Sequence, residues 1–585
     1  MKKTYIAILA ALFAAVSCSL KEVPSSFVNR DHYYGNVTQC ESALYGVYTP
    51  LTAIYQANFM LMTEACSDIW YSRSTTVDAC LDVTPAKPQF GATVWRQGYL
   101  GVMRANECIE GILASELDEK EKMPLVAEAR VLRAMYYYVL TCTFNGVPFY
   151  KNMVADDKTL QEIRKLPRTD ARDIREDLYY DLKDNALPYF TEENGLKVRT
   201  SEVPHYRAGY ALALMLMSKF AMWNEDWALA MEPLMALKDI YGELTEENYP
   251  LEQTMWRYKN TPESIFEIQH DWSRTDVQFA GNVAAIMTPQ HGINKETGEY
   301  LFDGVSLPFM GEDQTSWSAL VATNTYGIFR PAQGGTKTEN ANYQNSLFDP
   351  MPLTYDDEYD NVDGRYYTRL DLDAIAKGEI RGKKIDRRVL LTLGLGNLET
   401  GSTFTYARRY GIGWAGPKFW CPGMTLAQDS NNYKVFRYAD AVLMLAECCC
   451  NLEDADGAMQ YLNIVRKRAG VDPVDNFTGF ESLTTVIRAE RARELGGEFQ
   501  RKFDLVRWGR ERDFRKKLYR IHSSAGESGM NRLLQILRIR LCVRESSLAT
   551  GSILSLTRNV PCREEYLPMT NTSQKGCRTL RIDMT

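Results

Sequence analysis

Histidine is scarce in this sequence, and no pair of residues has the spacing of a common zinc site. Among 585 residues there are five histidines, and neither a His-x-x-x-His helix nor a Cys-x-x-Cys pair occurs. The G-x-S-x-G turn of serine hydrolases is missing as well, because Gly526-Glu527-Ser528-Gly529 is one residue short of it. The sequence therefore carries no signature of a zinc enzyme or of a serine hydrolase, and we expect no metal ligands.

A membrane-spanning run is also lacking. Two lysines precede an apolar stretch over residues 5–16, which is shorter than the roughly 20 residues that a spanning helix needs. This layout predicts a secretory signal peptide over residues 1–17. Ala15-Val16-Ser17-Cys18 resembles a bacterial lipobox, so we expect Cys18 to be lipidated and residues 18–36 to form a tether. The alternative is a soluble secreted protein in which Cys18 is incidental.

Two other motifs are incomplete. Gly411-Ile412-Gly413-Trp414-Ala415-Gly416 matches the dinucleotide-binding pattern, but Pro417 follows and no strand-helix unit surrounds it. A phosphate would have no helix N-terminus to bind there. The acidic stretch from Asp356 to Asp363 could bind calcium, although Tyr359 stands where an EF-hand needs its first ligand relative to Gly364. We favour a solvated acidic loop and expect no cofactor, with calcium left open.

Thirteen cysteines would suggest disulfides in an exported chain, but their spacing forms no framework. Cys448, Cys449 and Cys450 are adjacent, and two of them fall on an apolar helix face. That position favours small core residues over metal or redox ligands. Aromatic residues are abundant, with 34 tyrosines. A tyrosine offers a flat face and a polar edge, which suits both cores and binding surfaces.

Apolar residues recur along much of the chain at the spacing of a helix with one buried face. Examples are the sets Leu44, Val47, Tyr48 and Leu51; Val131, Ala134, Met135 and Tyr138; and Ala208, Ala211, Leu212 and Met215. Strand-like alternation is rare, so we predict a mainly α fold. Two helix pairs have tight polar joints, at Asn224-Glu225-Asp226 and from Asn451 to Gly457. Each helix pair can bury its apolar stripe only against the neighbouring pairs. This arrangement predicts a tetratricopeptide-like superhelix.

Between residues 270 and 430 this periodicity is lost, and glycine, proline, asparagine, aspartate and aromatic residues dominate. A stretch this long is unusual as a simple connection and is typical of functional surface. We therefore expect an irregular, loop-rich ligand-binding region here. Its aromatic residues include Trp272, Tyr300, Trp317, Tyr326, Tyr343, Trp414 and Trp420.

Several short stretches, taken together, resemble one protein family. They are Val23-Pro24-Ser25-Ser26-Phe27, Ala43 to Leu51, Trp95 with Arg104-Ala105-Asn106, Glu128 to Ala134, Phe144-Asn145-Gly146-Val147-Pro148, Arg437-Tyr438-Ala439-Asp440, Asn463 to Gly470, Glu490 to Leu495, and Phe503 to Gly509. In this order and spacing the chain resembles the SusD/RagB family of Bacteroidetes outer-membrane lipoproteins, from residue 1 to about residue 512.

The resemblance implies a helical body of tetratricopeptide-like units with an irregular ligand-binding region, attached to the cell surface by a lipidated cysteine. It also implies a partner, a SusC-like TonB-dependent transporter in the outer membrane, over which the protein sits as a lid. Members mostly capture glycans, a minority capture peptides, and they are binding proteins, not enzymes. Three alternatives stay open: peptide capture, a glycoside hydrolase with two concealed carboxylates, and a scaffold without a ligand. No nucleic-acid partner is expected for an exported chain.

The resemblance also indicates which residues contact the ligand. In this family they lie in variable loops, one of which follows the first helix, and Asp68 to Arg73 fills that position here. An aromatic face can stack on a sugar ring while Asp, Asn and Arg bind its hydroxyl groups. The candidates are Trp70, Tyr71, Trp272 and Trp317 as stacking platforms, with Asp68 and Arg73 as polar contacts. Core packing is the alternative for each tryptophan, and Trp95, Trp223, Trp227 and Trp508 are expected in the core.

Charged residues in the shared motifs are expected to be structural. Glu128, Arg130 and Arg133 share one predicted helix. Arg491, Glu494, Arg501 and Asp504 could form partly buried ion networks between helix pairs. Buried charges need partners of opposite sign, and these motifs supply both signs.

We divide the mature chain into four parts beyond the tether: a SusD-like helical region over 37–269, the ligand-binding region over 270–430, a SusD/RagB helical region over 431–512, and a basic tail over 513–585. The formal net charge is -7, yet residues 515–585 hold 13 Lys and Arg against 5 Asp and Glu. The family ends differently, and aromatic residues nearly vanish after Trp508-Gly509. We therefore hypothesise a reading-frame change in the gene. A resequenced locus whose intact frame encodes this same tail would refute it.

Overall fold

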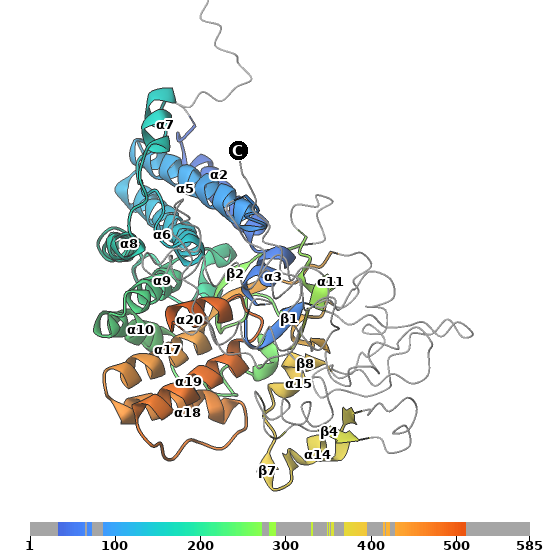
Figure 1. Ribbon diagram of the computed structural model, residues 1–585. Helices are drawn as coiled ribbons and strands as arrows, with labels where there is room; N and C mark the ends of the chain where they lie inside the picture. Colours follow the sequence, from blue (N-terminus) through green and yellow to red (C-terminus); the bar gives the residue numbers. More distant parts are fainter. Residues whose placement is uncertain are drawn as a thin grey trace, which may run out of the picture.

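The structure is a computed structural model that describes residues 33–64, 67–72, 86–271, 280–287, 329–331, 348, 350, 353–355, 368–394, 414–415, 417–421 and 428–509. Helices dominate these residues, as the sequence predicts. Figure 1 shows the long helices stacked side by side, from the blue N-terminal ones through green to orange, with the short yellow elements on the opposite side. Among the described helices, none has both the length and the apolar character needed to cross a membrane.

The N-terminal helices are α2 (Val37–Ile54), α3 (Ala57–Thr63), α5 (Gly91–Leu113), α6 (Glu119–Phe144), α7 (Asp157–Arg164), α8 (Ala171–Asn185), α9 (Tyr210–Trp223) and α10 (Trp227–Tyr241). The later helices are α11 (Val283–Met287), α14 (Leu372–Lys377), α15 (Val389–Thr392), α17 (Tyr438–Asn451), α18 (Ala455–Arg468), α19 (Phe480–Leu495) and α20 (Arg501–Arg507). Short 3-10 helices are η2 (Leu187–Tyr189), η3 (Thr200–Glu202), η4 (Pro204–Tyr206), η5 (Leu251–Thr254) and η9 (Pro417–Phe419).

The described strands form antiparallel pairs and no larger sheet. The pairs are β1 (Trp70–Ser72) with β3 (Phe329–Pro331), β2 (Ser264–Ile268) with β10 (Tyr433–Arg437), β4 (Leu353–Tyr355) with β5 (Thr368–Leu370), β6 (Glu379–Ile380) with β7 (Lys383–Lys384), and β8 (Leu393–Gly394) with β9 (Trp414–Ala415). The β2–β10 pair is buried along its whole length and joins the middle of the chain to the start of the C-terminal helices.

The two predicted helix joints are confirmed, and they have the same construction. Glu225 and Glu453 both adopt left-handed backbone conformations, with φ of 60° and 62°. The aspartate that follows each of them caps the next helix, since Asp226 accepts from the backbone N–H of Leu229 and Asp454 from that of Gly457. The second helix begins at Ala455, inside the stretch predicted as a turn.

Close packing of α5 on α6 requires glycine. A Cβ atom on Gly101 would lie 2.2 Å from the ring of Tyr136, and one on Gly98 would lie 2.8 Å from the side chain of Leu140. Tyr136 is fully buried, and its hydroxyl donates to the carbonyl of Val47 on α2. One tyrosine thus holds α2, α5 and α6 together.

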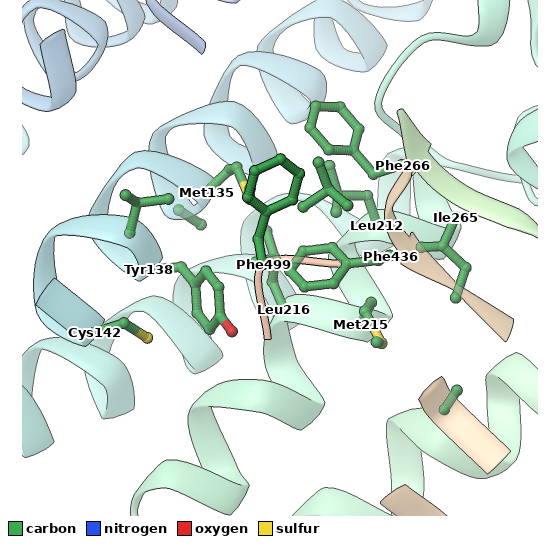
Figure 2. Close-up of a cluster of buried hydrophobic side chains, with 14 of the residues drawn as sticks. Met135, Tyr138, Cys142, Leu212, Met215, Leu216, Ile265, Phe266, Phe436 and Phe499 are labelled. Atoms are coloured by element: carbon green, nitrogen blue, oxygen red, sulfur yellow. The ribbon is translucent and has the colours of Figure 1, made fainter. Parts of the chain in front are cut away.

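The core connects the N-terminal helices to the C-terminal region. Figure 2 shows Met135 and Tyr138 of α6 facing Leu212 and Met215 of α9, with Phe436 of β10 beside them. All five side chains are at most 2% exposed. They include members of two of the predicted apolar faces, so the periodicity identified the buried side of these helices.

The cysteine prediction is confirmed. Cys448, Cys449 and Cys450 are free and buried. Burial raises the pKa of the Cys449 thiol to about 12, so it stays protonated.

The four tryptophans predicted in the core, Trp95, Trp223, Trp227 and Trp508, are instead half-buried at its rim. The guanidinium of Arg175, for instance, lies 4.6 Å from the ring of Trp223. An indole is large enough to pack one face on the core and leave the other to a charged neighbour.

Candidate ligand-binding site

Two parts of the chain predicted to carry ligand contacts meet in a strand pair. In the β1–β3 ladder, Trp70 lies opposite Pro331, Tyr71 opposite Arg330 and Ser72 opposite Phe329. These positions are far apart in sequence, so the loop after the first helices and the region 270–430 meet through tertiary structure. β3, the partner of β1, contacts α11, and Figure 1 shows both β1 and α11 away from the stacked pairs α9–α10 and α17–α18.

Asp68 is held in place by an arginine. Nε and Nη2 of Arg501 both lie 2.7 Å from its carboxylate oxygens, and the same guanidinium lies 5.4 Å from the ring of Trp508. A bidentate pair of this kind fixes both side chains. Asp68 therefore connects the β1 segment to α20. A ligand that bound Asp68 would have to share its carboxylate with Arg501.

Trp70 lies in the core, which is the alternative that the sequence left open. Its side chain is 2% exposed and packs edge-on against Phe419, with ring centroids 6.2 Å apart. An indole that stacks on a sugar must leave at least one of its faces uncovered by protein. In this structure Trp70 instead supports the strand that carries Tyr71.

Of the remaining candidates, Tyr71 alone lies within the described residues. Tyr71 is in β1, whereas Arg73, Trp272 and Trp317 fall outside the described residues. So do Cys18, the acidic stretch from Asp356 to Asp363, most of the glycine-rich motif 411–416, and the tail after Gly509. Among the residues that are described, no cluster of His, Cys, Asp and Glu could hold a metal ion.

A cluster of buried aromatic rings packs against the strand pair through Phe419, which contacts Trp70 of β1. Trp256, fully buried, has its ring 5.1 Å from Phe419, 4.9 Å from Tyr433 and 5.7 Å from Phe499. Phe499 in turn packs on Tyr55, at 5.2 Å. No sequence periodicity predicts this aromatic cluster, because its members come from five separate segments.

The segment Asp429–Tyr433 forms hydrogen bonds with two other parts of the chain, at residue 270 and at residues 282–283. On one side, the backbone N–H of His270 donates to Asn432, and Nδ1 of His270 lies 3.0 Å from the carbonyl oxygen of Asn431. On the other, the Tyr433 hydroxyl accepts from the N–H groups of Asn282 and Val283, at 2.6 and 2.9 Å. Burial lowers the pKa of His270 to about 4, so the ring is neutral and Nδ1 is the donor.

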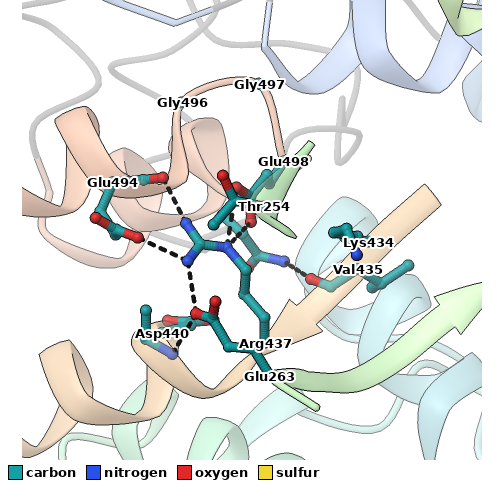
Figure 3. Close-up of polar contacts among 12 residues, drawn as sticks. Thr254, Glu263, Lys434, Val435, Arg437, Asp440, Glu494, Gly496, Gly497 and Glu498 are labelled. Atoms are coloured by element: carbon teal, nitrogen blue, oxygen red, sulfur yellow. Dashed lines mark hydrogen bonds and ion pairs between the residues drawn. The ribbon is translucent and has the colours of Figure 1, made fainter. Parts of the chain in front are cut away.

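A buried ion network joins β10 to α19 and to neighbouring segments. Figure 3 shows Arg437 of β10 between Glu494, Glu263 and Glu498. The corresponding distances from its guanidinium are 2.6, 2.8 and 2.9 Å. Burial opposes ionisation of Glu494, but the charges of Arg468, Arg437 and Arg388 outweigh it and hold its pKa far below the usual value.

Residues from the loop-rich region complete this network. Arg388 pairs with Asp386, Glu490 and Glu494 at 2.6, 2.6 and 3.0 Å. Lys418 pairs with Glu498 at 2.6 Å. Neither Arg388 nor Lys418 belongs to a recognisable motif, so no local pattern predicts that they join this network.

The structural role predicted for the motif charges is confirmed. Arg491 binds Asp440 and Asp504 at 2.8 and 2.9 Å. In the N-terminal half, Arg130 and Arg133 share Asp181, each at 2.6 Å. Glu128 accepts from Arg207 at 2.6 Å. These charges satisfy one another in the interior and are not free to bind a ligand.

Two family models match this chain. One, described as "SusD family", matches residues 423–544, which reach past residue 512. The other, described as "Starch-binding associating with outer membrane", matches residues 36–185. A relative, SusD-like protein P25 of Formosa agariphila, is 24% identical over 546 residues, which cover 85% of this chain and 88% of that protein.

Solved structures share the fold. A SusD-like carbohydrate binding protein from Bacteroides fragilis has a TM-score of 0.60 at 19% identity, covering 83% of this chain and 88% of its own. A SusD superfamily protein from Bacteroides vulgatus has a TM-score of 0.56 at 16% identity, with coverage of 85% and 94%. Surface glycan-binding protein A from Bacteroides uniformis has a TM-score of 0.54 at 18% identity, with coverage of 81% and 88%.

Proposed function

Because this chain is a SusD/RagB family protein, we propose that it is a cell-surface lipoprotein that captures a glycan and delivers it to a SusC-like TonB-dependent transporter. In this proposal Cys18 carries the lipid, and the protein binds its ligand without chemical conversion. The outer-membrane description of one matching family model supports the location. A related fold among solved carbohydrate-binding proteins supports the ligand class.

The observation that carries the proposal is the pairing of β1 with β3. It joins the segment Asp68–Arg73 to the region 270–430, the two places where the sequence predicts ligand contacts. Trp70 of the pair packs on Phe419, which belongs to a cluster of buried rings with Trp256 and Tyr433. A rigid base under variable loops is the usual construction of a binding site.

Binding can be tested with the purified full-length protein on glycan arrays and by titration calorimetry, with a peptide library in parallel. We expect a glycan to bind, and Trp272→Ala or Trp317→Ala to weaken it about tenfold, since one lost aromatic contact is worth about 1 kcal/mol or more. Tyr180→Ala is the matched control, because Tyr180 is 44% exposed on α8 among the stacked helices. Binding of peptides alone would favour the peptide-capture alternative, and hydrolysis of the bound glycan would favour an enzyme.

The anchor and the partner need separate experiments. Cys18→Ala should release the protein from outer-membrane fractions while leaving glycan binding intact. Purification of the lipidated protein from its own cells should recover a transporter barrel in stoichiometric amounts. Retention of Cys18→Ala in the membrane would contradict the lipid anchor without affecting the ligand proposal.

A further inference from the structure

Asp429 is a fully buried carboxyl group that, among the described residues, is bound by hydrogen-bond donors and by no cation. Its oxygens accept the backbone N–H groups of Ala284 at 2.9 Å and Asn431 at 3.2 Å. Gly281 pairs with it through the backbone, and a Cβ atom on Gly281 would lie 2.6 Å from the Asp429 carboxyl group. Among the described residues, no ion pair includes Asp429.

Glu64 is a second carboxyl group of the same kind. It is fully buried at the end of α3 and accepts the backbone N–H groups of Gly497 at 3.3 Å and Arg501 at 3.2 Å. The guanidinium of Arg501 is bound by Asp68. Within the described part of the chain, Glu64 also forms no ion pair.

The two carboxyl groups bracket one structural unit. We call residues 57–64 and 280–287 the α3–α11 unit. Its halves are joined because the side-chain oxygen of Asn282 accepts the backbone N–H of Ala57 at 2.7 Å. Asp429 binds the α11 end of this unit to the β10 segment, and Glu64 binds the α3 end to α20. Both ends are therefore held through a buried carboxyl group.

In the described part of the chain, few charged or titratable groups face these carboxyl groups. Tyr433, Lys259 and Cys421 surround Asp429, and the His270 ring packs on Tyr433 at 4.3 Å. Near Glu64 are Arg501, and Lys502, whose ammonium donates to the carbonyl of Met62. None of these contacts neutralises either carboxylate by direct pairing.

We propose that Asp429 and Glu64 form a pH-sensitive latch that holds the α3–α11 unit against the helical body when protonated and loosens when ionised. Burial raises the pKa of both groups to about 7. When the unit opens, water reaches the carboxyl groups and their pKa values return toward 3.8 and 4.5. The docked state thus binds protons more tightly, so docking is strongest below about pH 4. It weakens as the pH rises toward 7 and then levels off. This inference does not depend on the proposed ligand.

Hydrogen exchange of the full-length protein tests the latch at pH values from 5 to 8. After correction for the intrinsic exchange rate, opening of peptides covering residues 57–64 and 280–287 should increase by up to about tenfold per pH unit for each carboxyl group exposed, up to pH 7. Asp429→Asn and Glu64→Gln should each halve the slope of the logarithm of opening against pH, in both peptides. Each variant removes one of the two titrating groups that hold the α3–α11 unit. The double variant should abolish the slope.

Asp156→Asn is the matched control, because Asp156 is an exposed cap of α7 and should leave the slope unchanged. Infrared difference spectra of the unmodified protein provide a readout that needs no variant. Between pH 8 and pH 6 the carbonyl stretch of buried, protonated carboxyl groups should appear. Absence of that band, or a slope that survives in the double variant, would overturn the latch.

Discussion

Arg437 and Glu494, 57 residues apart in sequence, bind each other twice. Nη1 of Arg437 lies 2.6 Å from the Glu494 carboxylate, and Nη2 donates to the Glu494 backbone carbonyl at 2.6 Å. Both side chains are 1% exposed. This contact joins β10 to α19 and lies at the centre of the network that also holds Arg388 and Lys418 from the loop-rich region.

Removing the charge of Glu494 should strongly destabilise the protein. Glu494→Gln would leave three buried arginines, Arg388, Arg437 and Arg468, short of an anionic partner. The expected loss in the free energy of unfolding is about 3–5 kcal/mol, measured by urea denaturation. Glu232→Gln is the control, because Glu232 pairs with Lys183 at the surface, and it should cost less than about 1 kcal/mol. Equal losses for the two variants would contradict a structural role for the network.

Two glycine substitutions should have opposite effects on stability. Gly101→Ala would drive a Cβ atom to within 2.2 Å of the Tyr136 ring and force α5 away from α6. We expect a loss of about 1–3 kcal/mol. Gly46→Ala on α2 meets nothing within 4 Å. It should stabilise the protein by about 0.5–1 kcal/mol, because alanine is the better helix former. Thermal unfolding of both variants provides the comparison, and a stable Gly101→Ala protein would show that the helices can separate without penalty.

Asp504 should contribute stability that acid removes. Burial opposes its ionisation, but the charges of Arg491, Arg507 and Lys219 prevail and lower its pKa to about 2, from 3.8. A lowered pKa means that the contribution is present above pH 4 and is lost as the pH falls toward 2. Asp504→Asn should therefore be less stable than the unmodified protein at pH 7 by about 2 kcal/mol, and the gap should close in acid. A gap independent of pH would show that the loss comes from packing.

The three adjacent cysteines should resist alkylation in the folded protein. Cys448, Cys449 and Cys450 are at most 4% exposed, and burial keeps their thiols protonated. Mass spectrometry after treatment with N-ethylmaleimide should find the peptide containing them unmodified, and modified after denaturation in urea. Rapid modification of the native protein would mean that α17 opens far more easily than its packing suggests.

The helical body follows from local features of the sequence. Local periodicity and capping residues act over one or two turns, so the buried faces around Met135 and Leu212, and the joints at Glu225 and Glu453, could be predicted from neighbouring residues alone. The motif charges, including Arg491 and Asp504, were correctly expected to pair because buried ions require partners.

Which distant residues meet could be learned only from the folded chain. Trp70 lies in the core because Phe419 covers it, and Asp68 is held because α20 brings Arg501 alongside. The joining of β1 to β3, and of Arg388 and Lys418 to Glu494 and Glu498, likewise depends on segments that no local pattern relates. Contacts of this kind are set by the packing of the whole core, whose energy is shared among many residues and leaves no periodic trace in the chain.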